Sequence, residues 1–337
     1  MQVQGTDPAN NVGAFASLNG VATDLSHGAV FVDSGTGKSF QISYHAEGST
    51  FDAGANGNDI MLQVVTPVGG ANLTWRGNGT DNNWDVTTTA DWWNGTSLVT
   101  FTNGDFVTFD NSGSNNSPLN LVGNLSPTTL NVNATKDYIL AGGGKLTGTV
   151  VLTKTNTGTF TLVTDNDYIG TTLVQNGTLQ LGTNGTTGSI TATATLNASG
   201  TLAYNRSDDI VITNAAFAGP GSVVHKGSGK MTVAANVISP DYTGNTFVNG
   251  GELQLGEGTG TVGALGGKIS IGSTNVLRYY HNGTGANSTV ANSLSGNGTV
   301  IYDYPGIIYH TYTIPTTIGN SNFTGTNILK ANVKVDA

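Results

Sequence analysis

Residues that could perform chemistry are few and scattered in this 337-residue chain. A zinc site on a helix requires two histidines, or a histidine and an acidic residue, four positions apart. None of the histidines has such a partner, and the sequence contains no helix that could carry one. A serine-hydrolase elbow requires the pattern G-x-S-x-G, which the stretch around Ser228 does not match. We therefore expect structural or solvent-facing roles for all five histidines: His27, His45, His225, His281 and His310.

Acidic residues are the second candidates, because parallel β-helices include polysaccharide lyases and hydrolases that place carboxylates in one cleft. An acid–base pair needs pKa values pushed apart by burial or by neighbours, and a lyase of acidic sugars also needs Lys or Arg beside its substrate. Only 12 Lys and Arg residues are spread over the chain. We therefore expect turn-capping rather than catalytic roles for the three densest groups, and we predict no catalytic residue. The groups are Asp105 with Asp110, Asp165 with Asp167, and Asp208 with Asp209.

Two further motifs could bind ligands. GANGNDIML, residues 54–62, is similar to the calcium-binding nonapeptide G-G-x-G-x-D-x-U-x, which makes Asp59 a calcium candidate. That ion is held between ligands of successive turns, so with a single copy we favour a turn cap. Four tryptophans fall within 19 residues, where they either cover the open end of a core, as we favour, or form a platform for sugars. They are Trp75, Trp84, Trp92 and Trp93. No cofactor is predicted.

The composition is typical of short strands separated by tight turns, with 49 Gly residues and only 10% charged residues. The formal net charge is −9 without any cluster of basic residues, which argues against nucleic acid and anionic membranes as partners. No apolar run approaches the ~18 residues that a membrane-spanning helix needs. Cysteine is absent, as suits an exported bacterial protein, and the N-terminus shows no signal-peptide pattern. We expect either that a signal was removed or that the chain is a piece of a longer protein.

The chain contains an internal repeat. Residues 152–182 read LTKTNTGTFTLVTDNDYIGTTLVQNGTLQLG, and residues 223–256 read VVHKGSGKMTVAANVISPDYTGNTFVNGGELQLG. Drifting offsets of 72 to 77 residues between matched positions are typical of a solenoid whose loops vary in length while its strands stay in register. The matched positions include Lys154 with Lys226, Tyr168 with Tyr242, and Leu181 with Leu255.

Within each copy, apolar residues alternate over short runs that end at Gly, Asn or Asp, which predicts strands with one inward face. A period of about 74 residues is too long for one coil, so we predict three coils of roughly 20 to 25 residues, stacked in parallel over residues 70–337. Leu181 and Leu255 should then point inward at matching positions. Antiparallel β-sandwich and propeller folds would account for the same turn residues.

These residues resemble the autotransporter-associated β-strand repeat, a passenger repeat of large secreted and surface proteins of bacteria. The family pattern reads L-T-K-x-G-x-G-T-L-T-L, N-x-Y-x-G-x-T and V-x-x-G-T-L-Q-L-G; Asn156 stands where it usually has Gly. LTWRGNGTDNNWDVTTTADWW with FTNGDFVTFDNSG (73–113) is similar to the family's opening part, and residues 4–65 resemble its closing segment, here SFQISYHAEGSTFDAGANGNDIMLQVV (39–65). The resemblance implies a right-handed parallel β-helix.

Together these observations predict an all-β chain, a right-handed parallel β-helix or β-solenoid with a smaller N-terminal β segment. We expect that β segment over residues 1–66, a linker over 67–72, a Trp-rich opening part over 73–150 and solenoid repeats over 151–337. The predicted function is that of an extracellular or cell-surface structural protein, a stalk or fibre subunit that is not an enzyme. The alternatives are an adhesin-type module for glycans or host surfaces and, third, a polysaccharide-degrading enzyme.

The order of the segments bears on the partners. The closing-type segment comes first, and the chain stops at ILKANVKVDA, which still alternates apolar and polar residues. This order predicts either a fragment adjoining other modules of a longer chain, or a subunit whose N-terminal segment completes the C-terminal coils of the next copy. The second arrangement is a head-to-tail contact, which generates a filament when it does not close into a ring.

Overall fold

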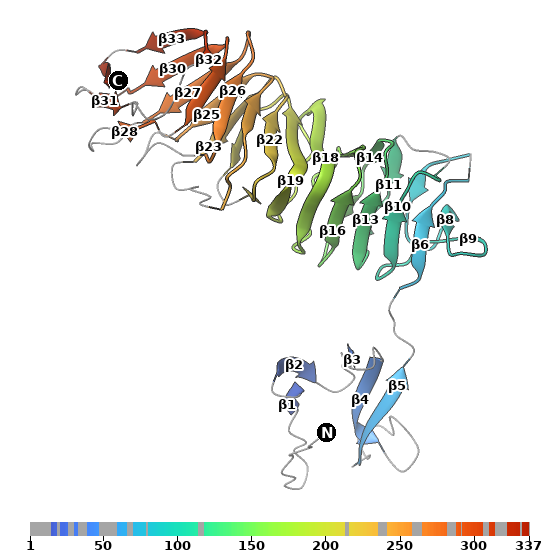
Figure 1. The fold of residues 1–337 in the computed structure, drawn as a ribbon. Helices are drawn as coiled ribbons and strands as arrows, with labels where there is room; N and C mark the ends of the chain where they lie inside the picture. Colours follow the sequence, from blue (N-terminus) through green and yellow to red (C-terminus); the bar gives the residue numbers. More distant parts are fainter. Residues whose placement is uncertain are drawn as a thin grey trace. The chain divides into compact units, whose positions relative to one another are not determined.

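Across the residues that it describes, the computed structural model contains strands and no helix, and it divides into two compact units, Met1–Gly70 and Ala71–Ala337 (Figure 1). In the first unit it describes only the backbone of the strands. In the second it describes all residues except 79, 114–117, 213–215, 235–240, 258–264, 282–287, 291, 306–309, 314–321, 331 and 337. The division after Gly70 falls inside the stretch 67–72 that the sequence marks as a linker.

The first unit is a small antiparallel β segment. Strands β1 (Phe15–Leu18) and β2 (Val21–Leu25) pair with each other. Strand β4 (Ser39–Ala46) pairs with both β3 (Val30–Val32) and β5 (Asp59–Val65). The predicted N-terminal β segment is therefore confirmed as a β structure, and its antiparallel pairing distinguishes it from the second unit.

The second unit is a parallel β-solenoid whose strands form three ladders along the stacked coils (Figure 1). The first ladder holds β6 (Asn72–Trp75), β10 (Phe106–Phe109), β13 (Thr129–Asn133), β16 (Val151–Thr155), the first parts of β18 (Thr172–Gly185) and β19 (Ala194–Arg206), and β21 (Phe217–Ala218). Later coils place β28 (Ser288–Thr289), β31 (His310–Thr313) and β34 (Val333–Asp336) on this side.

The second ladder runs through most of the solenoid. It holds β7 (Asn83–Trp84), β11 (Leu119–Leu121), β14 (Tyr138–Gly142), β17 (Thr159–Leu162), the later parts of β18 and β19, β22 (Ser222–His225), β24 (Thr246–Val248), β26 (Lys268–Ile271), β29 (Ser293–Gly296) and β32 (Asn322–Phe323). The third ladder holds β12 (Asn124–Leu125) and β15 (Lys145–Leu146), then β20 (Ile210–Ile212), β23 (Lys230–Val233), β25 (Glu252–Leu255), β27 (Val276–Tyr280), β30 (Thr299–Asp303) and β33 (Thr326–Leu329).

Successive coils stack in register, as the sequence predicts. From β10 onward, paired residues lie 19 to 27 positions apart, as in Phe160 with Leu179 and Val300 with Asn327. The first coil is longer, with Asn72 paired to Phe106, because it contains the antiparallel strands β8 (Trp92–Trp93) and β9 (Leu98–Val99). The parallel solenoid is confirmed, and the alternative antiparallel sandwich and propeller are excluded for the described coils.

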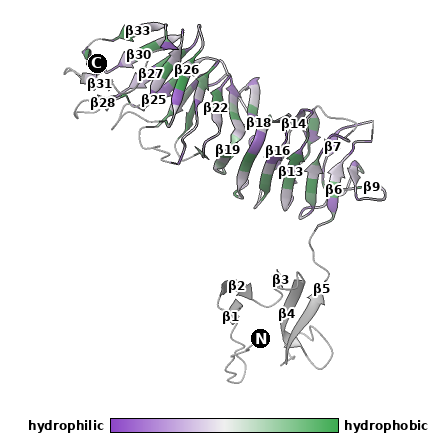
Figure 2. Cartoon of the chain, viewed as in Figure 1, coloured by the Kyte–Doolittle hydropathy of each residue, from purple (hydrophilic) through white to green (hydrophobic). Residues whose placement is uncertain are grey.

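Alternation along each strand builds the core. In β13 the pattern places Leu130 and Val132 inside and Asn131 between them outside, and Leu130 pairs with the buried Leu152 of the next coil. Hydrophobic and hydrophilic positions accordingly alternate along the strands in Figure 2. Each coil offers too little apolar surface to fold alone, so stacking on its neighbours is what makes it stable.

The sequence repeat does not coincide with a whole number of coils, which corrects one prediction. Leu181 and Leu255 are both buried, but they belong to different ladders. Three coils beyond Leu181, through Tyr204 and His225, lies Val248 rather than Leu255. Leu255 pairs instead within the third ladder, with Val233 and Tyr279. The 74-residue offset therefore spans three coils plus one side, and the second copy is turned by one face about the solenoid axis.

Candidate functional site

The tryptophan cluster lies at the N-terminal end of the solenoid. Trp75, Trp84 and Trp92 have no exposed surface, and Trp93 is half-buried. Their rings meet edge-to-face, with centroids 5.2 Å apart between Trp75 and Trp92 and 5.0 Å apart between Trp84 and Trp92. A buried ring cannot stack on a sugar, so this geometry supports an end cap of the core for these three residues.

The three predicted carboxylate groups are all engaged with their own surroundings. Asp105 accepts hydrogen bonds from the backbone amides of Ala71 and Thr102 at 2.7 Å each. Lys145 donates to Asp167, and this bond lowers the pKa of the Asp167 carboxyl. Arg206 donates to Asp208 at 2.8 Å and lowers its pKa in the same way. The other three carboxylates also accept hydrogen bonds from nearby groups: Asp110 from Arg76 and Ser112, Asp165 from Ser189, and Asp209 from the Lys230 amide.

The remaining candidates give no metal centre. Among the described residues, no group of three or more histidine or acidic side chains is arranged to hold a metal ion. His225 is buried, its Nε2 donates to the Gly229 carbonyl at 3.0 Å, and burial lowers its pKa. His281 is also buried and stacks on Tyr304. The side chains of His27, His45, His310 and Asp59 lie outside the described residues.

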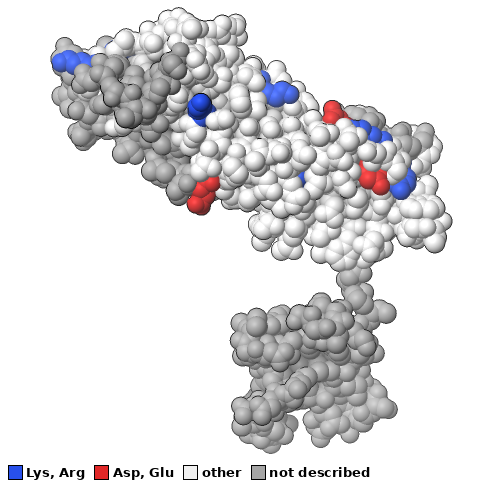
Figure 3. All heavy atoms as spheres, viewed as in Figure 1, with Lys and Arg blue, Asp and Glu red and all other residues white. Residues whose placement is uncertain are grey.

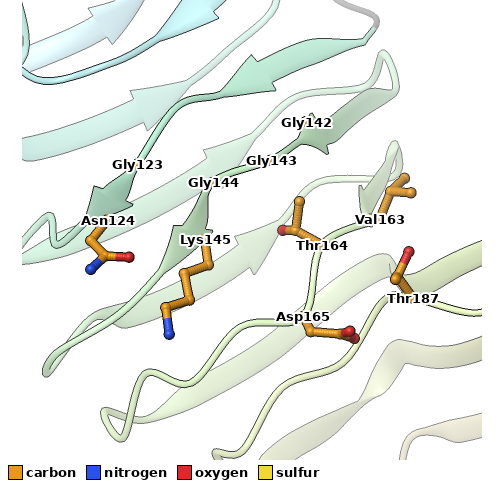
Figure 4. A pocket seen from close by; sticks show the side chains of 10 residues that line it. All are labelled: Gly123, Asn124, Gly142, Gly143, Gly144, Lys145, Val163, Thr164, Asp165 and Thr187. Carbon is orange, nitrogen blue, oxygen red and sulfur yellow. The ribbon is translucent and has the colours of Figure 1, made fainter.

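One open groove crosses the corner between the second and third ladders (Figure 4). Its volume is about 310 Å³, and it runs along the axis over four successive coils. The lining offers amide, amine, hydroxyl and carboxylate groups and no aromatic ring. The lining residues are Gly123, Asn124, Gly142, Gly143, Gly144, Lys145, Val163, Thr164, Asp165 and Thr187.

A buried asparagine holds the coils together beneath this groove. Asn166 Oδ1 accepts the Leu146 amide at 2.9 Å, and its Nδ2 donates to the carbonyls of Thr164 at 2.7 Å and Ser189 at 3.1 Å. One side chain thus ties three coils, so the groove floor is rigid. At the rim, Asp165 accepts from the Gly188 amide at 3.0 Å and from Ser189 Oγ at 2.9 Å. The sequence could not predict this groove, because its residues come from four coils without a linear motif.

The repeat motif contains a second buried polar group, the ammonium of Lys154, which sequence reasoning missed. Lys154 occupies an inward position between Val132 and Val174 and has no exposed surface. Its ammonium donates to the carbonyls of Thr155 and Asn156 at 2.8 Å each and of Asn176 at 3.2 Å. Burial lowers the pKa of Lys154 to about 8. The signal was available, because alternation in LTK places Lys154 on the same side as Leu152.

By register, His225 rather than Lys226 takes the equivalent place in the second copy. Leu152 pairs with Thr172 as Val223 pairs with Thr246, which aligns Lys154 with His225. Both basic side chains donate a hydrogen bond to a backbone carbonyl of the turn that follows.

The Y-x-G-x-T element also has a structural role. Tyr168 Oη lies 2.7 Å from Thr172 Oγ1, and a Cβ on Gly170 would lie 2.0 Å from the Val150 carbonyl oxygen.

One face of the molecule carries few charged side chains. On the face shown in Figure 3, charged side chains are sparse and both signs are present. The described part of the chain has no helix long and apolar enough to cross a lipid bilayer. The second unit is therefore a β-solenoid scaffold. Its coils are stacked, and buried polar side chains bond the backbone at repeated positions.

Comparison with known proteins shows which proteins this solenoid is similar to. Residues 152–181 and 224–255 each match the family described as Passenger-associated-transport-repeat. The chain is also similar to the "Adhesin BmaC autotransporter" of Brucella suis biovar 1 (strain 1330), with 29% identity over 181 residues. That match covers 47% of this chain and 5% of the relative. No solved structure matches the chain.

These findings confirm the resemblance drawn from the repeat motif. The chain carries two copies of the passenger-associated repeat and is similar to an autotransporter adhesin, which indicates a secreted protein of the bacterial cell surface. It spans only a small part of the relative that it matches. What the whole protein binds is therefore a matter for proposal.

Proposed function

We propose that this chain is a non-enzymatic stalk or fibre subunit, in which stacked coils provide length and the C-terminal edge receives the N-terminal segment of the next copy. Strand β33 at that edge carries the argument. Among the described residues it pairs with β30 alone. All four of its residues are exposed, including Ile328 at 38% and Leu329 at 50%. An uncovered strand with apolar side chains is a template for another strand.

The two ends of the solenoid differ, which supports a directional contact. The N-terminal coil is closed by the antiparallel strands β8 and β9 over buried tryptophans, whereas β33 pairs on one side alone within the described part of the chain. A capped end cannot simply continue a neighbour's stack. The N-terminal β segment is therefore the proposed occupant of the open edge, and the contact is head-to-tail.

Electron microscopy of the purified full chain tests this proposal. We expect filaments whose formation is abolished by the double substitution Ile328→Lys and Leu329→Lys, because charges on an edge strand oppose pairing. Deleting residues 1–66 should also abolish them. The matched control is Ile169→Lys, since Ile169 is 76% exposed but lies in the segment between β17 and β18, away from the edge. A full chain that stays monomeric at all concentrations, or filaments unchanged by the deletion, would contradict head-to-tail completion.

A second candidate function is adhesion through the axial groove. The groove's hydrogen-bonding lining suits a polar chain such as a glycan, and the relative is named an adhesin. Titration of immobilised glycans with the wild-type chain and with Asn124→Ala tests it. Loss of binding in the variant supports the groove, and equal binding by both chains excludes it.

A further inference from the structure

A buried carboxylate at the N-terminal end of the solenoid has little hydrogen-bond support. Asp91 has no exposed surface, and neither of its side-chain oxygens accepts a well-formed hydrogen bond, although the nearby Asn78 backbone amide lowers the pKa of the carboxyl in part. Its backbone is fixed, because the amides of Arg76 and Gly77 both donate to the Asp91 carbonyl, at 3.0 and 3.1 Å. Burial, reinforced by the negative charge of Asp81, raises the pKa of Asp91 to about 6. Leaving such a group unsatisfied is costly, so it requires an explanation.

A second buried oxygen in this region is also without a partner. Asn82 Oδ1 accepts no hydrogen bond, whereas its Nδ2 donates to the Pro118 carbonyl at 3.1 Å. This bond fixes the amide orientation, because only the nitrogen can donate to a carbonyl. Three acceptor oxygens from Asp91 and Asn82 are therefore buried without a well-formed hydrogen bond.

The surrounding loop concentrates negative charge instead of balancing it. Both Asp81 and Asp85 act on Asp91 electrostatically. Asn78 Oδ1 accepts the amides of Thr80 and Asp81, at 2.7 and 3.0 Å, which holds Asp81 in place. The Asp85 carboxylate accepts bonds from Thr88 and Thr89. Arg76 is directed to Asp110, at 3.2 Å.

We propose that Asp91, Asp81 and Asn82 bind a calcium ion at this end of the solenoid. Calcium takes six to eight oxygen ligands in flexible geometry, so two carboxylates, an amide oxygen and water suit it. A proton on Asp91 would supply a single donor and leave at least one of the three oxygens unsatisfied, whereas a divalent cation can contact all three and offsets the charge. The ion would join the loop after β6 to the residue preceding β8, and so lock the end cap.

Terbium luminescence tests the proposal on the full chain. The four tryptophans of the chain all lie in residues 75–93, so terbium bound beside Asp91 should be sensitised by tryptophan excitation. We expect a saturable signal at one ion per chain, which calcium displaces. Asp91→Asn should abolish the signal. Asp81→Asn, at an exposed position, should weaken binding at least tenfold with the fold intact. The control Asp209→Asn, remote and exposed, should leave binding unchanged.

Thermal unfolding supplies a second readout. Calcium should raise the melting temperature of the wild-type chain and leave that of Asp91→Asn unchanged. A wild-type chain that shows no sensitised terbium signal overturns the proposal. So does an Asp91→Asn variant that binds terbium like wild type, or a difference in melting temperature between Asp91→Asn and wild type that is the same with and without calcium, as a neutral buried acid would predict.

Discussion

The buried ammonium of Lys154 yields a quantitative prediction for the substitution Lys154→Met. The unfolded chain exposes this amine to water, with its ordinary pKa near 10.5, whereas burial lowers the folded value to about 8. Below pH 8 the amine is charged in both states, and folding bears the full cost of desolvating it. Each pKa unit corresponds to about 1.4 kcal/mol, so the cost is about 3 kcal/mol.

Between pH 8 and 10.5 the unfolded chain binds more protons than the folded chain, so the stability of the wild type rises with pH through this window. Methionine cannot titrate, so Lys154→Met lacks this rise. The carbonyls of Thr155, Asn156 and Asn176 lose their donor at every pH, which adds a constant offset without changing the slope. The advantage of wild type over the variant should therefore grow by about 3 kcal/mol from pH 7 to pH 10.5.

Urea unfolding followed by circular dichroism, at half-unit steps of pH, measures this difference directly. Lys268→Met is the matched control, because Lys268 is exposed and its amine is solvated in both states. Its difference curve from wild type should be flat. A Lys154→Met difference curve that is equally flat would refute burial of the amine inside the coil.

Further substitutions test the stacking. Leu181→Asp should lower the free energy of unfolding by several kcal/mol, because Leu181 is 1% exposed and an unpaired charge would be buried there; thermal melts equal to wild type would contradict this. Gly244→Ala should prevent folding or lower the melting temperature severely, since its Cβ would lie 1.6 Å from the Gly221 carbonyl oxygen. Gly143→Ala, where a Cβ meets nothing within 4 Å, should melt like wild type, and equal losses for both alanines would disprove the close approach.

The local pattern of the sequence was sufficient to predict the strands and the coils. Alternation at Phe160 and Leu162, closed by turn residues, predicts an inward face, and both side chains are buried in the core. Coil length followed from the repeat because every coil must bring the chain back over the previous one. The predicted stacking of Leu181 over Leu255 was wrong for a physical reason. Each face offers the same inward environment, so sequence similarity cannot tell on which face a copy begins.

The polar features were harder to predict than the core. Lys154 could have been found from its phase in the strand, but a lysine is ordinarily assigned to the surface because burial of its charge is costly. Asp165 and Asp167 were predicted to lie in a turn, but the role of Asp165 and Asn166 in tying coils depends on Leu146 and Ser189, which lie about one coil away on either side. Contacts of this kind depend on the register between coils, and that register is known only from the folded structure.

Disulfide cross-linking tests the central claim, that coils stack in parallel with the second copy turned by one face. The chain has no cysteine, so two introduced cysteines can pair only with each other. Thr201 in β19 and Ser222 in β22 are register partners, and adjacent strands lie within the span of a disulfide. The account predicts an intramolecular bond in Thr201→Cys/Ser222→Cys and none in Thr195→Cys/Val224→Cys. If the repeat spanned a whole number of coils, β22 would stack on the first part of β19. The Thr195/Val224 pair would then form the disulfide and the Thr201/Ser222 pair would not, and that result would contradict the account.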